Sequence, residues 1–435
     1  MDKRMKILVI SNFYPPYSFG GYEVLCQMII KFLASKGYDI QILTSVYGVE
    51  KPSSDGKIHR LLSYRYKAPE TPVSLKETIK RDIGDNRFLK RIISNFKPDL
   101  LYVFDMAGLS KSLLVSIQEL DIPAVYHFSG GWFAFDWMVD NWLAYWKYNS
   151  SKDKILLYMK QKFLGLITKD FFKKYAKKVT SVDSKNMIIK YASFGSDFLK
   201  LQYKQYCKDN FLWDKSEILY DGIVDIKQFQ KRIKTINKDN LIKLLYVGRV
   251  AKYKGVHTAV YAVAKLIQMK CNVSLSIVGP IIDKGYGEEL HKIINKQNLP
   301  VKFLGQVDYK VIQNIYFKHD ILIFPSIVDE VFGRVFIEAM ASSLTVIATG
   351  TGGSKEVLKD GENCLLFKPD NPDDLAEKIE LLLGNPDLCR KLIGNGVKLV
   401  KENFDIEVMG SRIEEYLKRV VNNCNKSPAE LDRNP

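Results

Sequence analysis

The chain is poor in the residues from which metal centres and disulfide frameworks are built. It contains six cysteines and five histidines among 435 residues. The cysteines are scattered, with no Cys-x-x-Cys pair and no Cys/His cluster, so neither a zinc site nor a disulfide framework is indicated. A reducing cytosol is the simplest compartment for such a protein. The six positions are Cys26, Cys207, Cys271, Cys364, Cys389 and Cys424.

Long apolar runs are missing as well. No apolar stretch approaches the roughly 18 residues that a membrane-spanning helix needs. The first apolar run, 7–10, follows a basic start but is too short for the core of a signal peptide, so we expect a chain that is not secreted. There is also no zinc finger, RNP-type motif or helix-turn-helix signal, and we expect no nucleic-acid partner.

Positive charge is abundant, and the formal net charge is +16. Such an excess fits an anionic membrane surface or a phosphorylated substrate, or else a compositional bias with no partner. The segment 151–178 concentrates this charge, because nine lysines oppose only Asp153 and Asp170 while apolar residues recur near helical spacing. It is either a surface helix with a solvated face or a helix lying against anionic lipid headgroups.

The composition otherwise describes a folded protein of more than one domain. The hydrophobic fraction is 46% and the aromatic fraction 12%, and 435 residues are too many for one ordinary core. Near the start, an apolar strand at 6–11, the turn Gly20-Gly21, a helix over about 23–36 and a strand at 40–44 predict a βαβ unit. Such units bind ligands beyond the carboxyl ends of their strands.

A second alternation of strands and helices begins near residue 240. Two open, mostly parallel α/β domains in tandem are therefore predicted. We place the first domain at 1–230 and the second at 231–405, with the join in a lysine-rich segment. We expect a last helix over about 406–421, with 406–423 packing back on the first domain and 424–435 forming a flexible tail. The polar stretch 50–91 is too weakly patterned to assign.

The most aromatic part of the chain is the segment 132–146, which holds seven aromatic residues in fifteen positions. Two interpretations stand side by side. The rings either pack in the core and between domains, or they form an apolar wall for an acceptor, since sugars and lipids both lie on aromatic faces.

Polar and glycine-rich loops follow the strands of the second domain. The loop 248–255 carries two cations, Arg249 and Lys254, and such groups make strong charge-assisted contacts with phosphate. Farther on, Glu330 lies in a loop and Glu338 one turn into the following helix, a pattern that suits a ligand with hydroxyl and phosphate groups. Other loop residues at these strand ends are Gly248, Gly279, Pro280, Val307, Phe332 and Gly333.

The ordered set of motifs is more specific than any one of them. G-R-x4-K-G, P-S-x3-E-x-F-G-x4-E-A-M-A and G-G-x2-E follow one another between residues 244 and 370. This series resembles the second domain of a family 4 glycosyltransferase, a group 1 enzyme of the retaining GT-B class. The first half resembles the family more loosely, through 12–16, Gly20-Gly21 and Tyr126-His127. The resemblance implies an α/β GT-B fold: two Rossmann-like domains facing across a cleft, with a C-terminal helix returning to the N-terminal domain.

The resemblance also implies roles for individual residues. Arg249 and Lys254 would hold the donor diphosphate, Glu338 the ribose hydroxyls, and Glu330 the hydroxyls of the donor sugar. The amides of Phe332-Gly333 would lie over that sugar. Gly20-Gly21 and His127 would approach it from the first domain. Residues that would line the donor site beside these are Gly248, Gly279, Pro280, Val307 and Arg334.

Simpler interpretations remain open for three of these side chains. Glu338 could be a solvent-facing helix residue, Glu330 a solvated loop residue, and His127 a satisfied core histidine. Arg334 stands where the family more often has an apolar residue.

The implied activity is a retaining, metal-independent hexosyltransferase reaction from a nucleotide-diphosphate sugar to a glycan or lipid-linked acceptor. No Asp-x-Asp pair occurs in the chain, so we expect neither a metal nor another cofactor. Cell-envelope polysaccharide or glycolipid synthesis is the expected setting, either in the cytoplasm or at the inner face of the membrane. A nucleotide-sugar epimerase or phosphorylase of the same fold, and a non-catalytic nucleotide-sugar binder, are the alternatives.

Overall fold

The computed structural model describes residues 4–17, 20–64, 75–133, 187–229, 236 and 240–425. The basic segment 151–178 lies outside these ranges, as does most of the aromatic segment 132–146 and the tail from 426 onward. The chain forms two compact units. Unit 1 comprises 1–195, 199–219 and 412–435, and unit 2 comprises 196–198 and 220–411.

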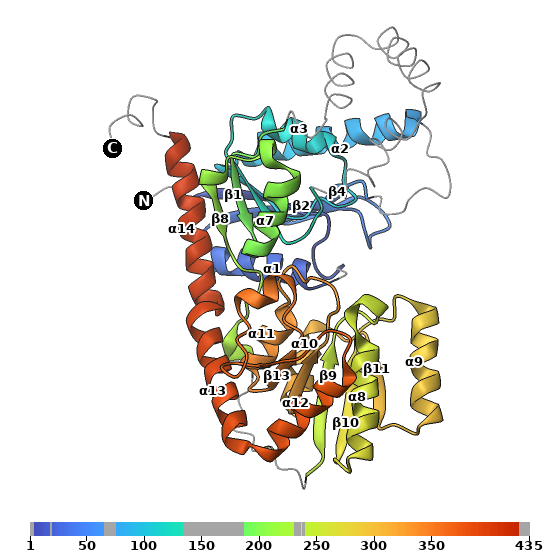
Figure 1. The fold of residues 1–435 in the computed structure, drawn as a ribbon. Helices are drawn as coiled ribbons and strands as arrows, with labels where there is room; N and C mark the ends of the chain where they lie inside the picture. Colours follow the sequence, from blue (N-terminus) through green and yellow to red (C-terminus); the bar gives the residue numbers. More distant parts are fainter. Residues whose placement is uncertain are drawn as a thin grey trace. The chain divides into compact units, whose positions relative to one another are not determined.

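Unit 1 is built on an eight-stranded sheet with the order β3-β4-β2-β1-β5-β6-β7-β8. Figure 1 labels β1, β2, β4 and β8 of this sheet. All neighbouring pairs are parallel except β3 with β4. The central strands are apolar and buried because helices cover the sheet. The strands are β1 (Lys6–Ile10), β2 (Asp39–Ser45), β3 (Ser53–Asp55), β4 (Ile58–Leu62), β5 (Leu100–Val103), β6 (Ala124–Phe128), β7 (Tyr191–Phe194) and β8 (Ser216–Ile218).

The helices of unit 1 that the structure describes follow the strands in βα succession. Apart from the last helix of the chain, they are α1 (Gly21–Ser35), α2 (Leu75–Phe96), α3 (Ser112–Gln118) and α7 (Asp197–Tyr206), whose first two residues belong to unit 2. The stretch 50–91, which the sequence left unassigned, contributes β3, β4 and the first part of α2. Its strands are only three and five residues long, too short for the alternation of side chains to stand out.

Unit 2 is built on a six-stranded, fully parallel sheet with the order β11-β10-β9-β12-β13-β14. Its strands are β9 (Ile242–Val247), β10 (Val273–Val278), β11 (Val301–Gly305), β12 (Ile321–Phe324), β13 (Thr345–Ala348) and β14 (Leu365–Leu366). Its helices are α8 (Val256–Gln268), α9 (Lys284–Lys296), α10 (Tyr309–Lys318), α11 (Arg334–Ala341), α12 (Pro372–Gly384) and α13 (Pro386–Asn403).

Both faces of the unit 2 sheet are covered, and β9 shows how. Leu244 and Tyr246 pack into the core that β9 shares with α8, α9 and α12. Leu245 points the other way, into the core that contains α10 and α11. Successive residues of a strand face opposite sides of its sheet, so an uninterrupted apolar run is what a strand between two helical layers requires.

The division between the units falls at 219/220, earlier than the boundary at 230 predicted from the sequence. Val224 donates its N–H to the carbonyl of Phe404 at 3.0 Å and accepts from the N–H of Ile406 at 2.7 Å. Phe229 packs in the unit 2 core. These contacts fasten 220–229 to unit 2, although the lysine-rich composition that marked the join begins only later.

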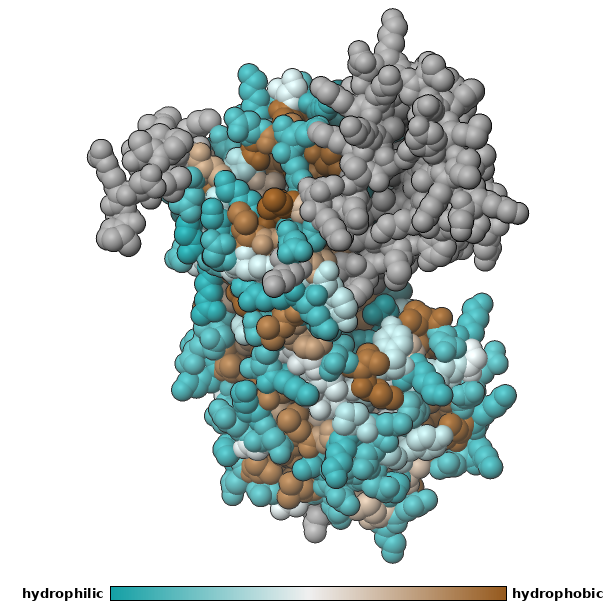
Figure 2. All heavy atoms as spheres, turned by 45° about the horizontal axis from the view of Figure 1, so that its top comes forward, coloured by the Kyte–Doolittle hydropathy of each residue, from teal (hydrophilic) through white to brown (hydrophobic). Residues whose placement is uncertain are grey.

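The last helix, α14 (Ile406–Asn425), belongs to both units, because unit 1 takes over from Arg412. The hydroxyl of Tyr416 donates to the carbonyls of Ala192 (3.0 Å) and Lys215 (2.8 Å). No helix in the described ranges is both long enough and apolar enough to cross a membrane. Hydrophilic residues predominate on the face shown in Figure 2, with apolar ones scattered among them.

A substitution of Gly222 would test how tightly the start of unit 2 packs. A Cβ at this position would lie 2.2 Å from the Phe332 ring and 2.9 Å from Ile337. We expect Gly222→Ala to destabilise unit 2 by about 1–3 kcal/mol through overpacking. At Gly384, in contrast, a Cβ would meet nothing within 4 Å, and Gly384→Ala should change stability by less than about 1 kcal/mol. Thermal unfolding of both variants checks this; equal shifts would contradict it.

Candidate functional site

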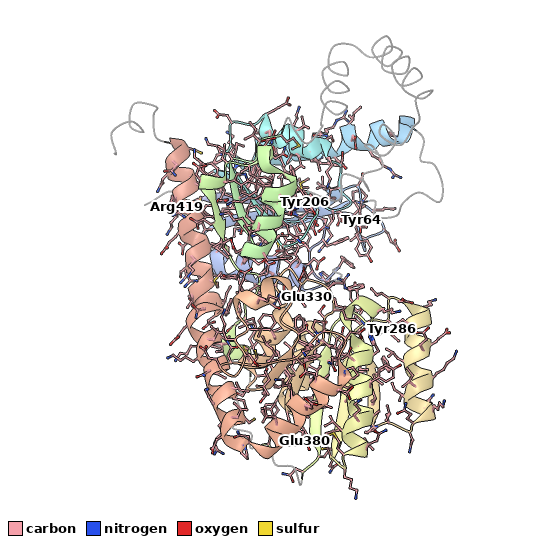
Figure 3. The ribbon with its side chains drawn as sticks, viewed as in Figure 1. Tyr64, Tyr206, Tyr286, Glu330, Glu380 and Arg419 are labelled. Carbon is pink, nitrogen blue, oxygen red and sulfur yellow. The ribbon has the colours of Figure 1, made fainter. Side chains whose placement is uncertain are left out.

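The candidate site lies at the carboxyl ends of the unit 2 strands. The loops after β9, β10, β11 and β12 all emerge there, because parallel strands end at the same edge of a sheet. In Figure 3, Glu330 and Tyr286 lie near this upper edge of unit 2, and Glu380 lies toward the opposite edge. The sequence-predicted donor residues of unit 2 come from these loops.

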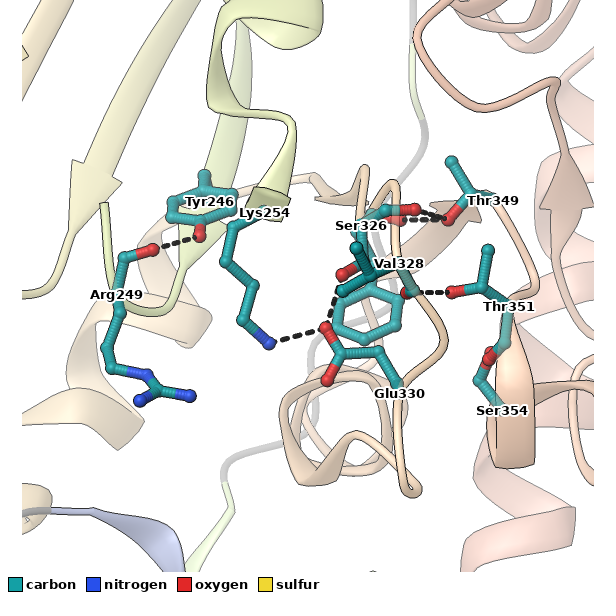
Figure 4. Close-up of polar contacts among 10 residues, drawn as sticks. Tyr246, Arg249, Lys254, Ser326, Val328, Glu330, Thr349, Thr351 and Ser354 are labelled. Carbon is teal, nitrogen blue, oxygen red and sulfur yellow. Dashed lines mark hydrogen bonds and ion pairs between the residues drawn. The ribbon is translucent and has the colours of Figure 1, made fainter. Parts of the chain in front are cut away.

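Lys254 and Glu330 form the central contact of the site. The Lys254 Nζ lies 2.5 Å from Glu330 Oε1, and the two side chains are 17% and 14% exposed. The Ser326 hydroxyl donates to the same Oε1 (Figure 4). Lys254 ends the loop after β9 and Glu330 lies in the loop after β12, so this contact joins two of the motifs found in the sequence.

Two groups at this site have no partner in the part of the chain that the structure describes. Within the described residues, Glu330 Oε2 accepts no hydrogen bond, and the Arg249 guanidinium makes no hydrogen bond or ion pair. The Arg249 backbone carbonyl, however, is held by the Tyr246 hydroxyl at 2.8 Å. The site therefore presents an acceptor oxygen and an exposed cation, each on a fixed backbone.

The loop that carries Glu330 packs against a glycine-rich turn that contains Gly352 and Gly353. Gly353 donates its N–H to the Glu330 carbonyl at 2.8 Å. A Cβ on Gly352 would lie 2.3 Å from that carbonyl oxygen, and Gly352 has a φ of 56°. Thr351 also donates its hydroxyl to the Val328 carbonyl at 2.9 Å (Figure 4). Because only glycine permits this approach, the glycines of G-G-x2-E are needed for the observed position of the Glu330 loop.

The loops after β9 and β10 pack with equal closeness. A Cβ on Gly279 would lie 1.9 Å from the Gly248 carbonyl oxygen. Gly248 donates its N–H to Val278 and Val250 donates to Pro280, both at 2.9 Å. Gly248, Gly279 and Pro280 thus form a compact backbone surface next to Arg249. Val307 lies in the loop after β11, where it packs against the apolar core around α10 and α11.

Glu338 is buried deeply on α11, at 5% exposure. The Tyr316 hydroxyl donates to its Oε2 at 2.9 Å, and Arg334 Nη2 lies 3.4 Å from its Oε1. Burial raises the pKa of the Glu338 carboxyl, and the Arg334 charge and the hydroxyls of Tyr316 and Tyr309 counteract part of that shift. Glu338 is therefore not a solvent-facing helix residue.

The segment between the two glutamates begins α11. Phe332 is 2% exposed and packs against Phe336. Gly333 precedes the helix with a φ of 104°, a left-handed conformation that favours glycine. Arg334 is the first helical residue, and its Nη2 also lies 3.4 Å from the Tyr309 hydroxyl and the Ile223 carbonyl. The helix N-terminus therefore directs backbone N–H groups toward the same edge of the sheet.

The remaining predicted site residues belong to unit 1. Gly20 precedes α1, and its N–H donates to Glu23 Oε2 at 3.0 Å; Gly21 is the first residue of that helix. His127, on β6, is 1% exposed, and its Nδ1 lies 2.8 Å from the Ser193 hydroxyl. Its ring stacks with that of Tyr22. The predicted donor contacts of these three residues remain predictions.

Sequence reasoning did not single out Ser326, Tyr309 or Tyr316 as functional. Ser326 could have been found, because it stands inside the P-S-x3-E motif. Tyr309 and Tyr316 gave no such signal, since they lie on α10 and reach Glu338 only in the folded unit. Among the described residues, no group of three His, Cys, Asp or Glu side chains is arranged to hold a metal ion.

The raised pKa of Glu338 predicts a pH-dependent difference in stability. The folded protein holds the Glu338 proton more tightly than the unfolded chain, whose value is near 4.5. The resulting stabilisation is present below that value and is lost as the pH rises through the folded pKa. We expect the melting temperature of Glu338→Gln, relative to wild type, to increase from pH 4.5 toward pH 8.

The control is Glu380→Gln, at an exposed position on α12. It should show no comparable trend in melting temperature. A Glu338→Gln variant that loses stability relative to wild type as the pH rises would contradict the assigned direction.

Two family models match the chain. The model for glycosyl transferases group 1 matches residues 227–399, and that for glycosyltransferase family 4 matches residues 19–168. The first match contains every unit 2 residue of the site, and the second contains Gly20, Gly21 and His127.

Most of the similar curated proteins align with about half of this chain or less. An uncharacterized glycosyltransferase of Methanocaldococcus jannaschii is 31% identical over 50% of this chain and 57% of its own length. The capsular polysaccharide biosynthesis glycosyltransferase CapM of Staphylococcus aureus is 26% identical over 44% of this chain and 49% of its own length. The chain thus spans about half the length of these relatives.

Solved structures show the fold over almost the whole chain. HepE from Anabaena, solved in complex with UDP and glucose, superposes with a TM-score of 0.62 and 19% identity, covering 96% of this chain and all of HepE. The two Rossmann-like units are those of the GT-B fold. With the family models at both ends and the site motifs in their expected order, the chain belongs to glycosyltransferase family 4, the glycosyl transferases of group 1.

Proposed function

We propose that this glycosyltransferase moves a sugar, with retention and without a metal, from a nucleotide-diphosphate sugar to a glycan or lipid-linked acceptor. The observation that carries the proposal is the juxtaposition of Arg249, Lys254 and Glu330 at one edge of unit 2. Two cations beside a carboxylate oxygen with no described partner suit a ligand that carries a diphosphate next to sugar hydroxyls.

The diphosphate is assigned to Arg249 and Lys254. The Arg249 guanidinium can receive phosphate oxygens without giving up an existing ion pair, whereas Lys254 must share its charge with Glu330. The N-terminus of α11 adds N–H donors and a favourable dipole. Charge that develops on the leaving diphosphate is then stabilised by fixed groups of the protein.

The two glutamates have different environments and so different proposed roles. Glu330 Oε1 is occupied by Lys254 and Ser326, which leaves Oε2 to accept from a donor-sugar hydroxyl. Glu338 is assigned to the ribose hydroxyls. An ionised carboxylate has about four lone-pair sites, so it can accept from ribose while it keeps a bond from Tyr316.

Retention is proposed to follow from attack on the face that the leaving group occupies. The bond from the anomeric carbon to the phosphate oxygen breaks, and a bond to the acceptor oxygen forms on the same face. The acceptor's proton passes to the leaving phosphate. His127 and Gly20-Gly21 are proposed to contact the donor from unit 1, and the protein supplies electrostatic stabilisation rather than a nucleophile.

A nucleotide-sugar donor is supported by the HepE complexes, whose ligands are UDP, glucose and UDP-glucose. A cell-envelope acceptor is supported by the similarity to CapM. We propose action in the cytoplasm, at the inner face of the membrane, where the basic segment 151–178 would meet anionic lipid.

The donor can be identified by its effect on stability. A panel of uridine, guanosine and adenosine diphosphate sugars should contain one that raises the melting temperature, because a ligand that binds only the folded state stabilises it by mass action. Mass analysis after incubation with that donor alone distinguishes the alternatives. An epimerised nucleotide sugar would indicate an epimerase, and absence of stabilisation by every donor would overturn the proposal.

Arg249 provides the first mutational test. We expect Arg249→Gln to weaken nucleoside-diphosphate binding about 10–100-fold, the cost of one lost charge-assisted contact. Lys252→Gln removes an exposed cation from the same loop and should change affinity less than about twofold. Isothermal titration calorimetry measures both, and equal losses would show that only the general charge of the loop matters.

Glu330 provides the second test. Glu330→Ala should leave nucleoside-diphosphate affinity largely unchanged and reduce turnover about 100-fold, the scale for a lost transition-state contact. Steady-state kinetics with the identified donor separate the two quantities. Turnover equal to that of wild type would remove Glu330 from the reaction.

A further inference from the structure

Arg60, in unit 1, is a buried cation that the proposed reaction does not use. It lies on β4 and is 7% exposed. No carboxylate in the described part of the chain pairs with its guanidinium, and its electrostatic neighbours are Tyr14 and Tyr17. Burying a charge without an opposite charge costs several kcal/mol, so the position of Arg60 requires an explanation.

Two contacts hold the Arg60 guanidinium in place, but they use few of its hydrogen-bond donors. Its Nη2 donates to the Pro15 carbonyl at 2.8 Å, and its Cζ lies 4.9 Å from the centroid of the Tyr17 ring. Among the described residues, its other N–H groups make no hydrogen bond. A guanidinium has five N–H donors in a rigid fork that matches phosphate and carboxylate. Within the described ranges, one neutral carbonyl and one ring therefore leave most of its donors unused.

Three further aromatic side chains form a cluster in the same unit. Phe13 packs edge-on against Tyr47 and Tyr64, with centroid distances of 4.9 and 4.6 Å. Tyr47 and Tyr64 are themselves 5.5 Å apart. The Tyr17 ring packs against Gly48, the chain neighbour of Tyr47, where a Cβ would lie 2.2 Å from that ring. Tyr17 is 36% exposed, and Tyr47 and Tyr64 are half-buried.

These rings come from the ends of three neighbouring parallel strands. Phe13 and Tyr17 follow β1, Tyr47 follows β2, and Tyr64, labelled in Figure 3, follows β4. The same edge of the sheet carries Gly20-Gly21 at the start of α1. Carboxyl ends of parallel strands are where open α/β sheets bind ligands, and tyrosines offer an apolar face together with a polar edge.

We propose that Arg60 and the tyrosine group of Tyr17, Tyr47 and Tyr64 form an acceptor subsite for a sugar that carries an anionic group. Arg60 binds the phosphate or carboxylate in a forked contact, and the rings pack against the sugar. The acceptor is then a phosphorylated or acidic sugar. This inference rests on the proposed transfer reaction, because it assigns the substrate class of the acceptor side of that reaction.

The alternative is that Arg60 has a purely structural role and only holds the loop after β1 in place. The Pro15 contact supports that role, but it needs only one N–H and no charge. Glutamine at position 60 could donate to the same carbonyl, whereas it could not bind an anion in a forked contact. Arg60→Gln therefore separates the two roles, and Arg60→Lys retains the charge without the fork.

The test measures binding of inorganic phosphate to unit 1. Arg249→Gln and Lys254→Gln are first combined, so that the donor site no longer contributes phosphate binding. Isothermal titration calorimetry at constant ionic strength then compares this background with Arg60 intact, with Arg60→Gln and with Lys57→Gln. Lys57 is the matched control, since it is a 63%-exposed cation paired with Asp39 at 2.7 Å near the start of β4.

We expect saturable phosphate binding that Arg60→Gln weakens at least tenfold and Lys57→Gln leaves unchanged. Arg60→Lys should give intermediate affinity. Competition with glucose 6-phosphate, glucuronate and glucose then distinguishes a phosphate group from a carboxylate, and neutral glucose should compete least. Melting temperatures show whether each variant folds.

Absence of phosphate binding in the background protein, or equal binding with Arg60→Gln, would overturn the subsite. Neither result would affect the donor assignment, because nucleotide binding is measured separately in the protein with Arg249 and Lys254 intact. Conversely, failure of every nucleotide sugar to bind would remove the transfer reaction while leaving the phosphate measurement valid.

Discussion

The contact between Lys254 and Glu330 is the interaction on which the candidate site depends. A cation from one strand end and an acid from another, 76 positions apart in the chain, meet at 2.5 Å. Their meeting requires β9 and β12 to be neighbours in a parallel sheet, so that both loops emerge at one edge. It also requires the Glu330 loop to be held from behind, which the close approach of Gly352 and Gly353 achieves.

The same unit places two acids eight residues apart in quite different surroundings. Glu330 is partly exposed and has one oxygen committed to protein donors. Glu338 is buried among Tyr309, Tyr316 and Arg334, and burial raises its pKa. The difference between their environments thus arises from packing rather than from the residue type, since a loop exposes one carboxylate and the second turn of a short helix buries the other.

Much of this arrangement could be predicted from the sequence. Buried strands and glycine turns indicated the two α/β units, and the ordered motifs indicated the glycosyltransferase family and, with it, the GT-B fold and the candidate residues of unit 2. Contacts between distant residues could not be predicted, because no local pattern specifies them. Tyr316 reaches Glu338 from another helix, and Ser326 and Lys254 both contact the same carboxylate oxygen of Glu330. The unit boundary was misplaced for the same reason, since the pairing of Val224 with Phe404 leaves no mark in the composition.

The path of the chain between the units has a consequence for exchanging parts between relatives. Unit 2 is not one continuous piece: residues 196–198 belong to it, where the Glu356 carboxylate accepts from the N–H groups of Asp197 and Phe198 at 3.0 and 2.8 Å. The chain returns to unit 1 within α14, between Ser411 and Arg412. A chimera that transplants the donor unit must therefore carry this three-residue excursion and be spliced inside a helix. A single junction at 219/220 would leave unit 1 with a foreign C-terminal helix and the transplanted unit without its partners for Glu356.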